Sequence, residues 1–180
     1  MVRRYYLLTA FGKDRPGIVA AVSRVLLDLQ GNIEDASMTR LGGEFSMMLV
    51  TALTVPAPSL EKRLNILAKK EGLQISAKPI PSAAVRRSKD GSARYLISLY
   101  GNDRPGLVCR VAEALSRRRV SITDLQTQVI GTAAKPVYVM LLEIMVPPAL
   151  DLEALRTELD NLRRELNVEI TLQDIEAVPL

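Results

Sequence analysis

Two six-residue segments bring together the groups that this sequence could use to hold a small charged ligand. They read Gly-Lys-Asp-Arg-Pro-Gly at 12–17 and Gly-Asn-Asp-Arg-Pro-Gly at 101–106. Each ends in a glycine, Gly17 or Gly106, just ahead of an apolar stretch typical of a helix. Glycine leaves the first helical turn without a side chain, so a ligand carboxylate could reach backbone N–H groups at the positive end of the helix dipole. Each segment could therefore form an anion-binding turn.

The same segments also have a purely structural interpretation. Pro16 and Pro105 suit the first position of a helix, because proline has the required φ and lacks an N–H that would be unpaired there. Asp14 and Asp103, two residues earlier, can accept hydrogen bonds from the free N–H groups of the first turn. We therefore expect a helix to begin at each proline. On one copy alone, capping is the stronger interpretation; because caps do not require the same residues twice, the duplication adds weight to a ligand site, and both interpretations stay open.

Few residues in this sequence could support catalysis or metal binding. The chain contains no histidine, which excludes histidine-based zinc sites and histidine-dependent nucleophiles. Ser23, Ser37 and Cys109 have no base at a recognisable spacing, and we expect Cys109 to lie in the core on the apolar side of its helix. The sequence therefore predicts a protein that is not an enzyme and that has no cofactor and no metal site.

The elements around the first segment follow the order strand, helix, strand, strand, helix, strand. Apolar spacing predicts a helix over 18–29, and a second helix that Ser59 caps and Gly72 closes. Gly42-Gly43 forms a tight hairpin turn. The predicted strands cover 5–11, 33–41, 44–55 and 73–80. This order is that of the ferredoxin-like fold of the α+β class, an antiparallel four-stranded sheet with both helices on one face.

The same order returns after a linker. Residues 81–93 combine Pro, Ser, Ala, Arg, Lys, Asp and Gly without apolar periodicity, so we expect one domain at 1–80 and another at 94–180. The longer segment 131–136 predicts a hairpin tip larger than Gly42-Gly43. The remaining predictions are helices from 105 to 118 and from 151 to 166, and strands at 94–100, 121–130, 137–146 and 168–175.

The two halves are copies of each other. A shift of 89 superimposes residues 12–40 on 101–129, and ten of the 29 positions are then identical. They include the glycines, aspartate, arginine and proline of the six-residue segment and apolar residues such as Val22 and Val111. The sequence therefore predicts two small domains, each able to bury a modest core.

The composition suits a soluble globular protein. The 180 residues are 48% hydrophobic and 24% charged, and no apolar run approaches the ~20 residues that cross a bilayer. We expect no membrane contact. Because one cysteine cannot form an internal disulfide and the N-terminus lacks a cleavage pattern, we expect a cytoplasmic location. Basic clusters at 86–89 and 117–119, in a chain of net charge +4, predict solvated surfaces that could meet an acidic partner.

The duplicated residues resemble the ACT domain, a small ferredoxin-like module that binds amino acids and regulates enzymes or transcription. The resemblance rests on Asp-Arg-Pro-Gly-Ile-Val at 14–19 and the following Val22, Leu26, 31–33 and Asp35, and it extends over residues 4–176. Two such modules in a chain of this length are similar to the glycine cleavage system transcriptional repressor family. Formyltetrahydrofolate deformylases begin with a similar module, but the catalytic domain that would follow has no counterpart in this sequence.

The resemblance also implies a ligand site. In ACT domains the ligand commonly lies between two modules, held by the loop from strand one to helix one of one module and the start of strand two of the other. Carried over to this sequence, the implied ligand-binding residues are Asp14, Gly17, Ile18, Asn32 and Ile33 in the first half and Asn102, Asp103, Gly106, Leu107, Ser121 and Ile122 in the second.

If the two modules pack with their sheets edge to edge, the implied pocket that combines the loop of the second half with Asn32 is the better equipped. Asn32 has an amide that both donates and accepts, whereas Ser121 offers one hydroxyl. Asp103 would pair with the α-ammonium group of an amino acid, and backbone N–H groups near Gly106 and Leu107 would receive its carboxylate.

The resemblance implies a non-enzymatic sensor. An amino acid, with glycine or serine as candidates, would change how a homodimer presents a surface to a protein partner such as a transcription activator, without direct contact to nucleic acid. Two alternatives stay open: a ligand-free dimerisation or interaction module, and an RNA-binding protein, since RNA-recognition modules share this order of elements. Residues 44–50 contain one aromatic side chain, Phe45, and no basic–aromatic motif, which argues against RNA.

Overall fold

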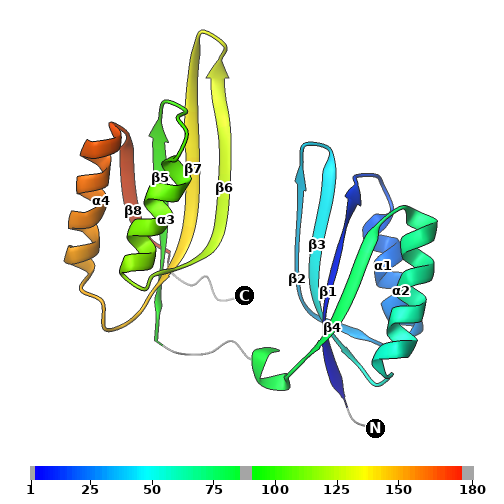
Figure 1. Cartoon of the computed structure of the whole chain (residues 1–180). Helices are drawn as coiled ribbons and strands as arrows, with labels where there is room; N and C mark the ends of the chain where they lie inside the picture. The colour runs from blue at the N-terminus through cyan, green and yellow to red at the C-terminus, as the bar shows by residue number, and fades with distance from the viewer. Residues whose placement is uncertain (1–2, 86–90, 176–180) are drawn as a thin grey trace. The chain divides into compact units, whose positions relative to one another are not determined.

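The chain folds into two compact units, Met1–Ser88 and Lys89–Leu180, here called the first and the second unit. The computed structural model describes residues 3–85 and 91–175 of them. In each unit, two helices lie against one face of a four-stranded antiparallel sheet (Figure 1). The predicted α+β class and the duplicated ferredoxin-like order of elements are thereby confirmed, while the basic cluster at 86–89 lies outside the described residues.

The first unit has the sheet order β2-β3-β1-β4. The short 3-10 helix Ser82–Val85 follows its last strand, within the predicted linker. Its elements are β1 Arg4–Lys13, α1 Ile18–Asp28, β2 Asn32–Leu41, β3 Glu44–Leu53, α2 Ala57–Glu71 and β4 Gln74–Ile80.

The second unit repeats this topology with the sheet order β6-β7-β5-β8. The pairing of β6 with β7 contains a bulge between Ile122 and Asp124, and β2 has its counterpart between Ile33 and Asp35. Its elements are β5 Ala93–Gly101, α3 Leu107–Arg117, β6 Ser121–Thr132, β7 Lys135–Val146, α4 Leu152–Leu166 and β8 Glu169–Asp174.

Alternation along the strands places a core between each sheet and its helices. In β1, Tyr6, Leu8 and Ala10 are buried while Phe11 is half exposed, because successive side chains point to opposite faces. The core of the first unit also contains Ile18, Val22, Leu26, Phe45, Met47, Leu49, Leu60, Leu64 and Leu67. The second unit buries the matching set from β5, β7, α3 and α4, so each unit has its own core.

The edge strands β2 and β6 are exposed along their whole length. Each pairs with its neighbour on one side only, so its outer row of backbone N–H and C=O groups faces away from the sheet. Both strands follow the first helix of their unit, and both include residues that the sequence assigned to the ligand site.

The structure corrects the predicted helix starts. Gly17 and Gly106 precede α1 and α3 with φ of 96° and 94° in the left-handed region, so the helices begin at Ile18 and Leu107 and the prolines lie outside them. Ser59 does not cap α2, because Pro56 in an extended conformation already accepts the N–H of Ser59 at 3.1 Å.

The predicted long hairpin tip at 131–136 is also wrong. β6 continues to Thr132 and β7 begins at Lys135, which leaves two turn residues, as at Gly42-Gly43. The additional residues lengthen the strands instead. The hairpin β6–β7 therefore extends past the end of β5, which pairs with β7 no further than Gly101 opposite Tyr138.

Candidate functional site

Three contacts fix the loop between β1 and α1. The N–H of Asp14 donates to the carbonyl oxygen of Gly43 at 2.9 Å, which ties the loop to the β2–β3 turn. The guanidinium of Arg15 donates to the carbonyl oxygen of Glu71 at 2.6 Å and to its Oε2 at 2.5 Å, which ties the loop to the end of α2. The segment that duplicates in sequence is thus held in a defined conformation.

The loop ends at a helix terminus that no side chain of the described residues caps. The expected cap does not form, because the carboxylate of Asp14 instead accepts from Nη1 of Arg40 at 3.3 Å. The first turn of α1 has four N–H groups without partners inside the helix. Gly17 leaves open space beside them, since apart from its own chain neighbours no described residue has a heavy atom within 4 Å of where a Cβ would be. Backbone donors, one carboxylate and one guanidinium therefore meet at the start of α1.

These groups border an open hollow of about 680 Å³. Its polar lining is Asp14, Arg15 and Arg40, and its apolar lining comes from α1, β2 and β3. The apolar residues and the glycine are Pro16, Gly17, Ile18, Val19, Ala20, Met38 and Phe45. A zwitterion with a small apolar portion matches this combination of charges and surfaces.

Arg40 is the residue that the sequence reasoning missed. It reaches the loop because β2 pairs with β3 in the register that places Arg40 opposite Phe45, whose side chain faces the helices. A signal was present in the sequence, since the shift of 89 that aligns the two copies places Val129 opposite Arg40. The charge at this position therefore distinguishes the first unit from the second.

Asn32 and Ile33 line a different hollow of about 480 Å³, beside the end of α1. Ala20 borders both hollows, so within the first unit α1 separates Asn32 from Asp14. The amide of Asn32 already donates to Oε1 of Glu34 at 3.1 Å, and its backbone carbonyl accepts from the buried Thr51 hydroxyl at 2.9 Å. The side-chain oxygen of Asn32 and its second amide N–H remain for a ligand.

In the second unit, the predicted residues occupy equivalent positions with less charge around them. Asn102 and Asp103 are exposed, and Gly106 adopts the same left-handed conformation as Gly17. Ser121 and Ile122 begin β6, and Val129 stands where Arg40 would be. The predicted pairing of Asn32 with the loop of the second unit stays a prediction.

Ile18 and Leu107 can take part in a site only through their backbones. Their side chains are 2% and 3% exposed and belong to the two cores. Each N–H, however, is the first of its helix.

Cys109 does not lie in the core, contrary to expectation. It is exposed, because the buried stripe of α3 runs through Leu107, Val111, Ala114 and Leu115 instead. Its thiol donates to Oε1 of Glu113 at 3.4 Å, and this hydrogen bond, together with the negative charge of Glu113, raises the pKa of Cys109.

Two kinds of feature are absent from the described residues. Over 3–85 and 91–175 there is no group of three or more Cys, Asp or Glu side chains placed to hold a metal ion. Within the same ranges, no helix is long and apolar enough to cross a membrane.

Comparison with known proteins assigns both halves to one family of domains. A family model described as the ACT domain matches residues 4–78 and again residues 94–173. These two ranges cover most of the chain and coincide with the two units.

Individual relatives are similar to one half or to both. A UPF0237 protein of Clostridium acetobutylicum is 36% identical over 72 residues, which cover 38% of this chain and 81% of that protein. The glycine cleavage system transcriptional repressor of Escherichia coli is 26% identical over 133 residues, covering 68% of this chain and 64% of the repressor. A crystal structure of an unknown protein from Galdieria sulphuraria superimposes with a TM-score of 0.82 at 25% identity, covering 97% of this chain and 99% of that one.

Proposed function

The chain belongs to the ACT-domain family, and on that premise we propose that it is a non-catalytic sensor that binds a free amino acid and regulates transcription through a protein partner. The observation that carries the proposal is the meeting of Asp14 and Arg40, 3.3 Å apart, beside the uncapped start of α1. This arrangement offers one group for each charge of an amino acid.

A bound amino acid would replace the Asp14–Arg40 ion pair, because each of these side chains would then pair with one of the two charged groups of the ligand. Its α-carboxylate would accept from Arg40 and from the free N–H groups that follow Gly17, at the positive end of the helix dipole. Its α-ammonium group would donate to the carboxylate of Asp14. Glycine and serine, the candidates from the sequence, are the first ligands to test, because the name of the similar Escherichia coli repressor refers to glycine cleavage.

The Escherichia coli protein is named a transcriptional repressor, and we propose that this chain likewise acts on transcription through another protein, such as a transcription activator, and as a homodimer. Its cytoplasmic location stays a prediction from the sequence.

A ligand-free interaction module is the second candidate. It is favoured by the fact that the polar groups of the site already have partners within the chain: Asp14 has Arg40, and Asn32 has Glu34. The RNA-binding alternative is weakened, because Phe45 on β3 is 3% exposed and packs beneath the helices, where it cannot stack on a base.

Thermal unfolding in the presence of each common amino acid tests the sensor. A ligand at a hundred times its dissociation constant adds about 2.7 kcal/mol to stability, and in a chain of this size that raises the melting temperature by roughly 5 to 10 °C. A rise with one or a few amino acids is the expected result. If none of them produces a rise, the ligand-free module replaces the sensor.

The duplication supplies matched variants that locate the site. Asp14→Asn should abolish the rise while Asp103→Asn leaves it, if the site of the first unit is used. Asn32→Ala and Ser121→Ala test the predicted strand contributions in the same assay. If Asp103→Asn and Asn32→Ala each abolish the rise in melting temperature while Asp14→Asn does not, binding belongs to the pocket that the sequence favoured.

A further inference from the structure

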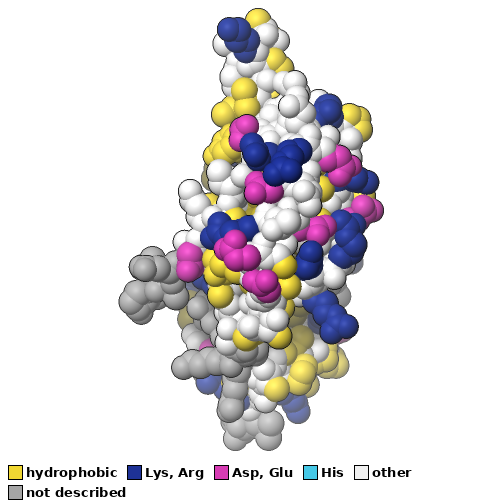
Figure 2. Space-filling view, turned by 90° about the vertical axis from the view of Figure 1, so that its left-hand side faces the viewer, with side chains coloured by type: hydrophobic (Ala, Val, Ile, Leu, Met, Phe, Trp, Pro, Cys, Tyr) yellow, Lys and Arg dark blue, Asp and Glu magenta, His cyan; other side chains and the backbone are white. Residues whose placement is uncertain are grey.

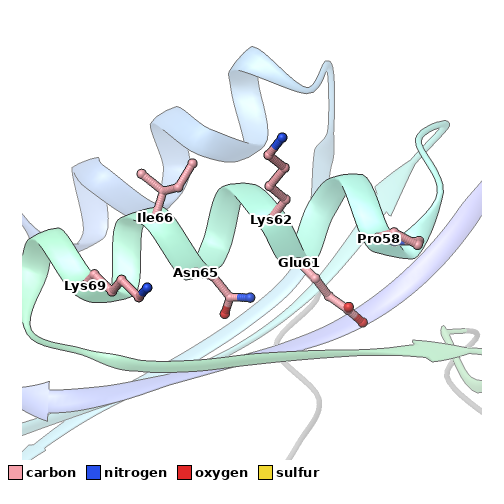
Figure 3. A pocket seen from close by; sticks show the side chains of 6 residues that line it. All are labelled: Pro58, Glu61, Lys62, Asn65, Ile66 and Lys69. Carbon is pink, nitrogen blue, oxygen red and sulfur yellow. The ribbon is translucent and has the colours of Figure 1, made fainter.

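The outer face of α2 surrounds one exposed apolar side chain with cations. Ile66 is 60% exposed. Lys62, Arg63, Lys69 and Lys70 stand four and three residues before it and three and four after it, which are the nearest neighbouring positions on a helix surface. In Figure 3, Lys62 and Ile66 project from the same side of α2. We call Ile66, these four cations and Arg24 of α1 the basic face.

Ile66 borders two shallow hollows on this surface. The first, of about 250 Å³, lies between α1 and α2. Besides Ile66, its apolar lining is Ala21, Val25 and Leu67, and its charged lining is Arg24, Arg63, Lys70 and Glu71. The second, of about 410 Å³, follows α2 past Lys62 and Lys69 (Figure 3). A bound chain could therefore bury an apolar side chain and meet cations on either side.

The cations of the basic face are largely without acidic partners. Among the described residues, none of Arg24, Lys62, Arg63 and Lys69 has a carboxylate within ion-pair distance. Lys70 lies 3.9 Å from Oε1 of Glu71, but the other oxygen of that carboxylate already holds Arg15 at 2.5 Å.

The second unit shows the same surface with its charges compensated. A shift of 95 places the buried Leu60, Leu64 and Leu67 of α2 on Leu155, Leu159 and Leu162 of α4. The same shift places Glu158 at the position of Arg63, Glu165 at that of Lys70 and Asn161 at that of Ile66, and the shift of 89 places Glu113 at that of Arg24.

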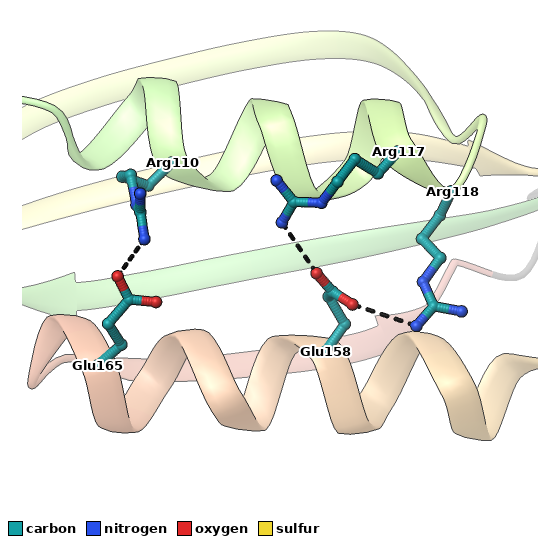
Figure 4. Close-up of polar contacts among 5 residues, drawn as sticks. All are labelled: Arg110, Arg117, Arg118, Glu158 and Glu165. Atoms are coloured by element: carbon teal, nitrogen blue, oxygen red, sulfur yellow. Dashed lines mark hydrogen bonds and ion pairs between the residues drawn. The ribbon is translucent and has the colours of Figure 1, made fainter.

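Two of these acidic residues, Glu158 and Glu165, bind arginines of α3 and Arg118, which follows the helix. Glu158 accepts from Arg117 at 3.0 Å and from Arg118 at 3.1 Å, and Glu165 pairs with Arg110 (Figure 4). Basic and acidic side chains accordingly alternate over the helix face of the second unit (Figure 2). The basic face is thus a property of the first unit and is not required by the fold.

We propose that the basic face binds an acidic amphipathic helix of a partner protein, with Ile66 contacting an apolar side chain between the partner's carboxylates. The inference rests on the proposed regulation through a protein partner and gives that partner a chemistry. Complementary charge favours encounter and fixes orientation. The residues that line the two hollows include no aromatic side chain that could stack on a base or anchor in a bilayer, and they include the acidic Glu61 and Glu71, so a protein partner fits better than a nucleic acid or a lipid surface.

Fluorescence anisotropy of the full chain with a labelled synthetic peptide tests this. The probe is an amphipathic peptide of about 15 residues, long enough to be helical when bound, with glutamates on both sides of a leucine stripe. Its control replaces every glutamate by glutamine. We expect saturable binding of the acidic probe that weakens with salt, and much weaker binding of the control.

Two variants with equal charge change locate the binding. Arg63→Glu introduces the residue of the second unit, and Lys78→Glu makes the same change on β4, at an exposed position outside the basic face. Arg63→Glu should weaken probe binding about tenfold, because repulsion replaces attraction at the contact, while Lys78→Glu should change it less than twofold. Ile66→Asn should weaken binding of both probes, since it removes the apolar contact.

Equal weakening by the two charge reversals would overturn the proposal, as would the absence of probe binding. Tighter binding of a single-stranded oligonucleotide, or of phosphatidylserine vesicles, than of the acidic peptide would also overturn it. The amino-acid melting assay on Arg63→Glu separates the two proposals. If Arg63→Glu loses peptide binding but keeps the ligand-dependent rise in melting temperature, the change affects the basic face alone. If the unaltered protein shows no such rise, the sensor proposal fails independently of the basic face.

Discussion

Replacing Arg40 by valine, the residue at the matching position of the second unit, should remove ligand binding with little effect on folding. The side chain of Arg40 is 73% exposed and that of its partner Asp14 is 28% exposed. Exposed ion pairs of this kind contribute about 0 to 1 kcal/mol to stability. Valine suits a strand, so we expect the free energy of unfolding without ligand to change by less than about 1 kcal/mol.

The expected loss of affinity is larger. A hydrogen bond to a charged group contributes about 1.5 to 3 kcal/mol, which corresponds to a roughly 10- to 150-fold weaker complex. At a ligand concentration that stabilises the unaltered protein by about 2.7 kcal/mol, a tenfold weaker complex adds about 1.4 kcal/mol and a hundredfold weaker one about 0.4 kcal/mol. The ligand-dependent rise in melting temperature should therefore fall to about half or less.

The assay is thermal unfolding of both proteins with and without the amino acid that stabilises the unaltered chain. Arg94→Val is the matched control, because it removes a comparable exposed ion pair, Arg94–Glu143 at 2.7 Å, in the second unit. An undiminished rise in Arg40→Val would refute the assignment of Arg40 to the ligand carboxylate. A large loss of stability without ligand would show that the pair with Asp14 serves the fold.

Three further predictions concern local geometry and charge. Gly17→Ala should destabilise the chain by about 1 to 2 kcal/mol in urea unfolding, because φ is 96° there and a side chain strains that region; an unchanged midpoint would contradict this. Hydrogen bonds from two arginines lower the pKa of Glu158 from its ordinary value of 4.5, so its carboxylate stabilises the fold above that pH and loses this effect as the pH falls through the lowered pKa. Glu158→Gln should accordingly cost up to about 1 kcal/mol at pH 7 and nothing once the carboxylate is protonated, whereas a difference that persists in acid would contradict the ion pairs. Because Glu113 raises the pKa of Cys109, Glu113→Gln should speed alkylation by iodoacetamide at pH 8, and an equal or slower rate would show that the contact does not control the thiol.

Periodicity and duplication were enough to predict the order of elements. The spacing of Val22 and Leu26 fixes the buried side of α1, which could therefore be read from the sequence. In β1, apolar residues lie on both faces, so the sequence identifies the strand but not its buried face. Helix starts were less predictable. Proline and aspartate suit a first turn in general, but Gly17 in the left-handed region moves the start of α1 past them.

The candidate site depends on contacts between residues distant in sequence. Arg40 contacts Asp14 for two reasons. The register of β2 with β3 sets the position of Arg40, and the hydrogen bond from the N–H of Asp14 to the Gly43 carbonyl holds the β2–β3 turn against the loop between β1 and α1. The two-residue turn at Gly42-Gly43 places Arg40 opposite Phe45, but no sequence pattern gives the contact between this hairpin and the loop that precedes α1. The prediction that Cys109 is buried was wrong for a local reason. Successive side chains along α3 lie about 100° apart around the helix, so a residue close in sequence to the buried stripe can still be exposed.

The exposed edge of β6 bears on how the protein behaves at high concentration. Over twelve residues, Ser121–Thr132, the strand contains one charged side chain, Asp124, whereas β2 contains Glu34, Asp35 and Arg40. Charged side chains on an edge discourage strands of other molecules from adding to it. Asp124→Asn should therefore increase concentration-dependent light scattering more than Asp35→Asn does, and a lysine at Gln126 should suppress it. Strand β6 is accordingly the place to alter when a more soluble form is wanted.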